Sequence, residues 1–171
     1  MMEARADHHI ALRVSDIDRS TRFYEEALGG QLVAAPILRE GPYIEAVFGP
    51  GVRVKVCHVA FAANAVELWQ FLEPANPIPP ADQTAVGIMH FGVTVDDVPG
   101  ALARVEAAGG RARFRVRRLG GATSAHFVYC EDPDGHVFEL MEATNVETVE
   151  QILKTIAALA RPDSESPAGT T

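Results

Sequence analysis

The sequence has few of the features that mark secreted, membrane-spanning or nucleic-acid-binding proteins. It contains only two cysteines, Cys57 and Cys130, in no C-x-x-C spacing, so free buried thiols in a reducing compartment are expected. No apolar run of ~18 residues occurs, and no secretion signal precedes the first predicted strand. The formal net charge of −8 disfavours a nucleic-acid interface. We therefore expect a cytoplasmic protein that binds neither nucleic acid nor a membrane.

The remaining composition is that of a globular protein with a real core. Hydrophobic residues make up 47% of the chain and charged residues 22%. A length of 171 residues fits one domain, or two small modules that share a sheet. The one obvious linker is rich in proline and therefore extended. The predicted organisation is a first module over 8–73, a linker over 74–87, a second module over 88–143, a C-terminal amphipathic helix over 146–160 and a disordered tail over 161–171.

The second half of the chain repeats the pattern of the first. The segment from His9 to Ile17 is echoed by the segment from His90 to Val98. In each copy, an apolar strand leads through acidic residues to a helix that ends at a glycine pair. The offset between the copies differs by one residue between the histidines and the glycine pairs. Such close agreement indicates a duplication.

Apolar periodicity and turn signals predict the remaining elements. A helix runs to Leu28 in the first half, and another passes through Leu102 and Val105 in the second. The two loops over 37–41 and 119–124 carry no readable motif. Strands are expected at His9–Val14, Gln31–Ala35, Tyr43–Phe48, Val52–Phe61, Ala65–Leu72, Ile88–Val95, Arg113–Arg117, Ala125–Cys130 and Val137–Glu142.

Two histidines and two glutamates occupy matching places in the two halves: His9, Glu67, His90 and Glu139. With the period of two in a strand, each lies opposite the apolar residues that would face the helices. A carboxylate on a concave sheet face is costly unless it is paired or coordinated. Imidazole and carboxylate together suit zinc, nickel, cobalt or manganese, and iron less well. The pattern predicts one divalent metal per site.

Each of these residues also has a plainer interpretation. A single histidine is more often structural than a ligand, and a single glutamate is usually a solvated edge residue. The joint, duplicated pattern favours metal binding. His8 is an alternative to His9, although it falls on the opposite face of the strand.

At this point the chain resembles the vicinal oxygen chelate superfamily, which includes glyoxalase I, methylmalonyl-CoA epimerase, extradiol dioxygenases and bleomycin-resistance proteins. The resemblance is carried by the segment His9–Leu28, and by Glu131-Asp132-Pro133-Asp134-Gly135 followed by Phe138-Glu139-Leu140. It implies an α+β fold in which two βαβββ modules form a cupped mixed sheet that holds the metal. The four family ligand positions fall on the same two histidines and two glutamates, a set similar to bacterial glyoxalase I.

The resemblance also suggests roles for other residues. Glu45, expected on a strand, stands in the stretch where the epimerase places a non-ligand base, although a solvated edge carboxylate is as good an interpretation. Arg13 resembles a glyoxalase arginine and would hold a substrate carboxylate or phosphate; a structural salt bridge is the alternative. Trp69 and Met141 would form apolar pocket wall, or ordinary core.

Such a site supports proton abstraction next to a carbonyl through an enolate, with Glu139, Glu67 or Glu45 as the base. We expect a metal-dependent isomerase or lyase, like glyoxalase I or an acyl-CoA epimerase, acting on a small-molecule carbonyl or thioester and forming a homodimer. The alternatives are a metal-free binding or resistance protein and an iron-dependent ring-cleaving dioxygenase. Whether the modules pair within one chain or across a dimer is left open.

Overall fold

The computed structural model describes residues 9–62, 64–75, 84, 86–118 and 125–142, together with the single positions 147, 150 and 154. Its helices are α1 (Ile17–Leu28), α2 (Pro42–Phe48) and α3 (Val98–Ala107). Its strands are β1 (Ile10–Arg13), β2 (Gln31–Leu32), β3 (Ile37–Arg39), β4 (Arg53–Ala60), β5 (Ala65–Glu73), β6 (Phe91–Thr94), β7 (Arg111–Ala112), β8 (Arg117–Arg118), β9 (His126–Glu131) and β10 (Val137–Met141).

The strands form two five-stranded mixed sheets of the same topology. The first has the order β1-β5-β4-β2, with β3 also paired to β4. The second has the order β6-β10-β9-β7, with β8 also paired to β9. In each sheet the first and last strands of the module pair in parallel, and the other pairs are antiparallel. The predicted α+β fold of two βαβββ modules is confirmed, with the strand after each long helix divided into two short pieces.

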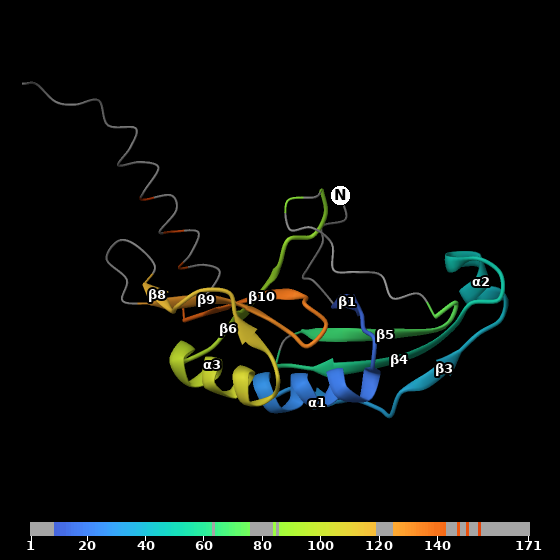
Figure 1. Cartoon of the computed structure of the whole chain (residues 1–171), viewed down its shortest axis with the longest axis horizontal. Coiled ribbons are helices and arrows are strands. Elements are labelled where there is room, and N and C mark those ends of the chain that lie inside the picture. Colours follow the sequence, from blue (N-terminus) through green and yellow to red (C-terminus); the bar gives the residue numbers. More distant parts are fainter. Residues whose placement is uncertain are drawn as a thin grey trace, which may run out of the picture.

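Helices α1 and α3 lie side by side and cover the same side of both sheets (Figure 1). Helix α1 is capped at its N-terminus by Asp16, whose carboxylate accepts hydrogen bonds from the amides of Asp18 and Arg19. Its C-cap is Gly29, where a φ of 70° favours glycine. One apolar core joins both modules, as the edge-to-face contact of the Phe23 and Phe138 rings illustrates at 6.2 Å between centroids.

Side-chain alternation divides each sheet into a core face and an opposite face, which we call the cup face. Val66 and Leu68 of β5 are buried in the core, and so are Phe138 and Leu140 of β10. The predicted parity of these strands is therefore confirmed. The residues between them project from the cup face, which α1 and α3 leave uncovered.

Three expectations about the elements are wrong. Tyr43–Phe48 is not a strand, because it forms most of helix α2, which begins at Pro42. The predicted loop at 37–41 contains strand β3, held by pairing with β4. The strand predicted at Arg113–Arg117 is interrupted, with residues 113–116 lying outside β7 and β8.

Other expectations meet the structure only in part. Both cysteines are buried and free, as predicted. In the described part of the chain, no helix has the length and apolar character needed to cross a membrane. The predicted helix over 146–160 lies outside the described residues except at positions 147, 150 and 154, which are helical. His8, the tail over 161–171 and most of the linker also lie outside them.

Candidate functional site

On the cup face of the first sheet, Glu67 lies between two imidazoles. Oε2 of Glu67 is 3.4 Å from Nε2 of His9, and Oε1 is 3.4 Å from Nε2 of His58. The carboxylate is mostly covered, with 15% of the side chain exposed, whereas both histidines are more than one-third exposed. These three residues form what we call the first half-site.

His58 is a site residue that the sequence analysis missed. The β4–β5 hairpin register places His58 directly across from Glu67, so their side chains share one face. The predicted strands Val52–Phe61 and Ala65–Leu72 are separated by only three residues, and counting back from this short connection would have found the pairing. The signal was therefore present in the sequence.

The second half-site consists of His90, Glu139 and Tyr129. Nε2 of His90 lies 3.5 Å from Oε2 of Glu139. Tyr129 stands directly across from Glu139 in the β9–β10 pairing, and its ring lies 4.7 Å from the His90 ring. Tyr129 thus occupies the position that His58 occupies in the first half-site.

Burial changes the acid–base behaviour of the second half-site. Desolvation raises the pKa of Glu139, although the neighbouring His90 acts in the opposite direction. Desolvation and the nearby Glu139 carboxylate raise the pKa of Tyr129, so its hydroxyl stays protonated.

The structure brings each predicted histidine to its own glutamate, but it does not bring the two pairs to one point. Within the described residues, no group of three or more histidine, cysteine, aspartate or glutamate side chains is arranged to hold one ion. The first half-site has three such residues, joined by the contacts of Glu67 with each histidine and by an edge-to-face contact of the two imidazole rings at 5.8 Å, but they are not arranged around one ion. For the two histidines and two glutamates to meet at one ion, the two modules would have to face each other differently from the way they do within this chain.

Each half-site nevertheless has the chemistry of part of a cation site. Glu139 is buried to 13% exposure, but its only ion-pair contact in the described chain is the 3.5 Å contact with His90. Nδ1 of His90 is buried and has no hydrogen-bond partner among the described residues. Buried polar groups normally have close partners. An imidazole and a carboxylate left in this state fit a divalent metal.

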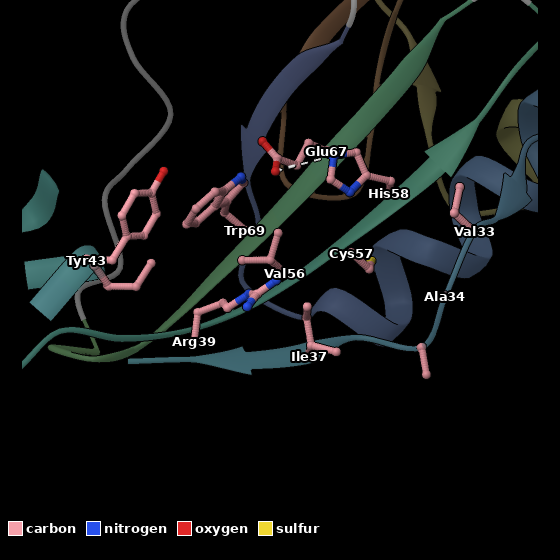
Figure 2. A pocket seen from close by; sticks show the side chains of 12 residues that line it. Val33, Ala34, Ile37, Arg39, Tyr43, Val56, Cys57, His58, Glu67 and Trp69 are labelled. Atoms are coloured by element: carbon pink, nitrogen blue, oxygen red, sulfur yellow. Dashed lines mark ion pairs between the residues drawn. The ribbon is translucent and has the colours of Figure 1, made fainter. Parts of the chain in front are cut away.

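A cavity of about 400 Å³ adjoins the first half-site (Figure 2). Glu67 and His58 stand at one part of its wall, and Trp69 lies beside Glu67 on the same strand. Most of the remaining wall is apolar. It is lined by Val33, Ala34, Ala35, Ile37, Arg39, Tyr43, Ile44, Val56, Cys57, His58, Glu67 and Trp69.

Helix α2 covers one end of the cup face of the first sheet. Buried Ile44 packs on the cluster that contains Val54 and Val56. The Phe48 ring lies 5.5 Å from the Trp69 ring and 5.2 Å from the Phe71 ring. Ile44 and Phe48 are four residues apart, so both lie on the face of α2 that packs on the sheet. Trp69 is thus both cavity wall and packing surface.

The other predicted site residues have different surroundings. Glu45 is exposed on α2, accepts a hydrogen bond from the Gly51 amide at 3.0 Å, and is not among the residues that line the cavity. Arg13 is exposed and aligned with Trp69 in the β1–β5 register, on the cup face. Met141 lies on the cup face of the second sheet, two residues beyond Glu139.

Comparison with known proteins gives consistent results. The family model of the Glyoxalase/Bleomycin resistance protein/Dioxygenase superfamily matches residues 8–140. A probable lactoylglutathione lyase of Vibrio parahaemolyticus is 31% identical over 78% of this chain and 88% of its own length. A probable chloroplastic lactoylglutathione lyase of Arabidopsis thaliana is 32% identical, but the chain spans only 35% of that protein.

A solved glyoxalase family protein from Bacillus cereus shares the fold. Its TM-score is 0.72 at 20% identity, over 82% of this chain and 95% of that chain. The resemblance inferred from the motifs is therefore confirmed. Because several relatives are named as lyases, the comparisons also agree with the prediction that the chain is an enzyme.

Proposed function

Since the chain belongs to the Glyoxalase/Bleomycin resistance protein/Dioxygenase superfamily, we propose that it is a divalent-metal-dependent lyase or isomerase of the glyoxalase type. Its substrate is a small-molecule carbonyl or thioester compound. The observation that carries this proposal is the matched pair of histidine–glutamate contacts, one on the cup face of each sheet.

The residues that would hold the metal are His9, Glu67, His90 and Glu139. When bound, a divalent cation supplies Lewis acidity, worth several kcal/mol toward a developing enolate. The choice among zinc, nickel, cobalt and manganese is not decided by these ligands, because all four accept mixed imidazole and carboxylate sets.

A carboxylate of the site would take the proton next to the substrate carbonyl. Glu139 and Glu67 are the candidates, since both are mostly buried and directed to the cup face. Burial removes water that would compete for the proton, which favours transfer between substrate and carboxylate. Glu45 is a weaker candidate because its carboxylate is bound to the Gly51 amide away from the cavity. This placement favours the glyoxalase-like reaction over an epimerase-like reaction with two opposed bases.

We further propose that a second copy of the chain completes the site. In a twofold dimer, the first half-site of one copy can face the second half-site of the other, giving two equal sites. Large apolar side chains are exposed in each module. Tyr43 and Val47 lie on α2 of the first module, and Ile88 and Met89 come directly before His90 of the second half-site. Exposed apolar groups of this kind mark protein interfaces. A cytoplasmic location remains a prediction from the sequence.

The experiment combines metal analysis with an activity assay. Full-length protein is dialysed with zinc, nickel, cobalt or manganese, and bound metal is measured by elemental analysis. Isomerisation of the hemithioacetal of methylglyoxal and glutathione is then followed, with other carbonyl compounds tested in parallel. We expect the wild-type protein to bind one of these metals stoichiometrically and the Glu139→Gln variant to lose it.

A matched control is Glu73→Gln, which makes the same change at an exposed position of β5. It should retain the metal. Failure of the wild-type protein to bind any of these metals would instead support a metal-free binding protein. Oxygen consumption with a catechol would support the iron dioxygenase.

A further inference from the structure

We propose that the cavity beside Glu67 selects the substrate, and that it takes a compact carbonyl compound with an apolar body and one carboxylate. The carboxylate binds Arg39, at a distance from the reacting carbonyl. This inference rests on the proposed function, because it assigns the reacting carbonyl to the Glu67 end of the cavity.

The middle of the cavity wall is apolar. The middle of the cavity is lined by Ile37, Val56 and Trp69, from three adjacent strands. These side chains share one face, since Ile37 stands across from Val56, and Val56 stands across from Trp69. An apolar wall favours an apolar ligand, because burial removes apolar surface from water.

Arg39 places a positive charge at the edge of this apolar cavity. Among the described residues that line the cavity, it is the only arginine or lysine. It forms no ion pair with any described residue, whereas Arg53, nearby in the sheet, is bound to Glu40 at 2.9 Å. An arginine without a carboxylate partner at the edge of an apolar cavity is suited to bind a carboxylate, which it holds through two parallel hydrogen bonds.

The positions of Arg39 and Glu67 set the shape of the ligand. Arg39 stands across from Val54, and Glu67 stands across from His58, four residues farther along β4. Four residues of strand span roughly 13 Å along β4, and the two residues are also separated across the sheet, because they lie on β3 and β5, which both pair with β4. The long arginine side chain shortens this distance. The carboxylate and the reacting carbonyl are therefore separated by an apolar spacer.

The same features disfavour a large polar conjugate in this cavity. A volume of about 400 Å³ is near the lower end of the ~300–1,000 Å³ typical of ligand pockets. A peptide conjugate would bring several amides and more than one carboxylate. The apolar residues of the middle wall offer few side-chain partners for such groups, and unpaired polar groups are costly to bury.

The chain offers a direct reporter of binding, because Trp69 is its only tryptophan and lines the cavity. Quenching of its fluorescence is measured on full-length, chelator-treated protein, so the measurement does not depend on metal. The probes are 4-oxo-4-phenylbutanoate and its uncharged amide, which share one chromophore. S-methylglutathione serves as the polar competitor. Variants Arg39→Gln and Arg39→Lys are compared with wild type, and circular dichroism checks that they fold.

The matched control is Lys55→Gln, which removes one positive charge from the same sheet. Lys55 lies on β4 between Val54 and Val56 and faces away from the cavity. Wild type and Lys55→Gln should bind the acid about tenfold more tightly than the amide. Arg39→Gln should bind both equally, and Arg39→Lys should recover part of the preference.

Equal binding of acid and amide by wild type would overturn the inference, as would a preference that survives in Arg39→Gln. Tighter binding of S-methylglutathione than of the acid would also overturn it. Absence of bound metal in the separate elemental assay would instead contradict the proposed function. The fluorescence result would not change, because it is measured without metal, so the two failures can be distinguished.

Discussion

In the first half-site His58 stands across from Glu67, whereas in the second half-site Tyr129 stands across from Glu139. Both halves keep one histidine next to the glutamate, at 3.4 and 3.5 Å. The first half therefore adds a second imidazole beside an open cavity. The second half adds an aromatic ring that itself contacts Phe114 and Phe127. The duplicated modules thus present the same pair of candidate ligands in two different surroundings.

The two modules therefore share the position of the histidine–glutamate pair but differ in the residues around it. The cavity of the first half is bounded by α2, and the helix has no counterpart among the described elements of the second half. Aromatic packing occupies the cup face of the second sheet instead. We expect the first half to supply substrate selection and the second half to supply a rigid wall.

The largest expected effect comes from disabling one half at a time. Glu67→Gln and Glu139→Gln should each lower activity about 10²–10⁴-fold, because each removes a carboxylate of the site. If sites form across two copies, co-expressing both variants gives some dimers with one intact site. Activity should then recover to about a quarter of the wild-type value. A mixture as inactive as either variant would show that the half-sites do not pair between copies.

A smaller effect is expected from the residue that differs between the halves. His58→Phe removes an imidazole that contacts Glu67 and should weaken metal binding about 10–100-fold. Tyr129→Phe keeps the ring contacts and should change metal affinity much less. Competition with a metal chelator measures both dissociation constants. Equal effects of the two substitutions would mean that the two half-sites do not differ in this way.

The contact between the halves is tested through Asp134. Its carboxylate accepts hydrogen bonds from Ser15 Oγ at 2.6 Å and from Arg19 at 2.7 Å, tying the second module to the start of α1. Burial opposes ionisation, but these hydrogen bonds outweigh it and hold the pKa of Asp134 below its ordinary value. The stabilisation is therefore present above the ordinary pKa and is lost as pH falls through the lowered one.

Asp134→Asn should lower the free energy of unfolding by about 1–3 kcal/mol at neutral pH. The difference from wild type should shrink as pH falls below the ordinary aspartate pKa, and should be lost once pH has fallen through the lowered pKa of Asp134, where the native carboxylate becomes protonated. Urea unfolding at several pH values measures this dependence. Asp97→Asn is the control, because Asp97 makes no side-chain capping hydrogen bond with α3. A pH-independent difference would contradict the assignment.

The smallest effect is expected at Glu45. Its exposed carboxylate binds only the Gly51 amide among the described residues, so Glu45→Gln should change stability by roughly 0.5 kcal/mol. Catalytic efficiency should stay close to that of wild type in the same assay. A severe loss of turnover would favour a second base and epimerase-like chemistry.

Much of the fold could be predicted from the sequence, because local patterns encode it. Alternation in β5 and β10 distinguishes the core residues Leu68 and Leu140 from the glutamate that precedes each of them in the sequence. Helix α1 is bounded by Asp16 and Gly29, whose capping preferences act within one turn. Helix α2 was missed because seven residues, nearly all apolar, are too short a segment to distinguish a helix from a strand, and its contacts with Trp69 and Phe71 come from β5, which is distant in the sequence.

The sequence by itself determined that this protein has two alike βαβββ modules and that each carries a histidine and a glutamate on its cup face. Only the tertiary structure decided that His9 meets Glu67 and His90 meets Glu139 as two separate pairs, that His58 joins the first, and that α2 bounds a cavity beside it. Strand parity needs only neighbours along the chain. Which pairs meet, and what closes over them, depends on packing between segments far apart in sequence.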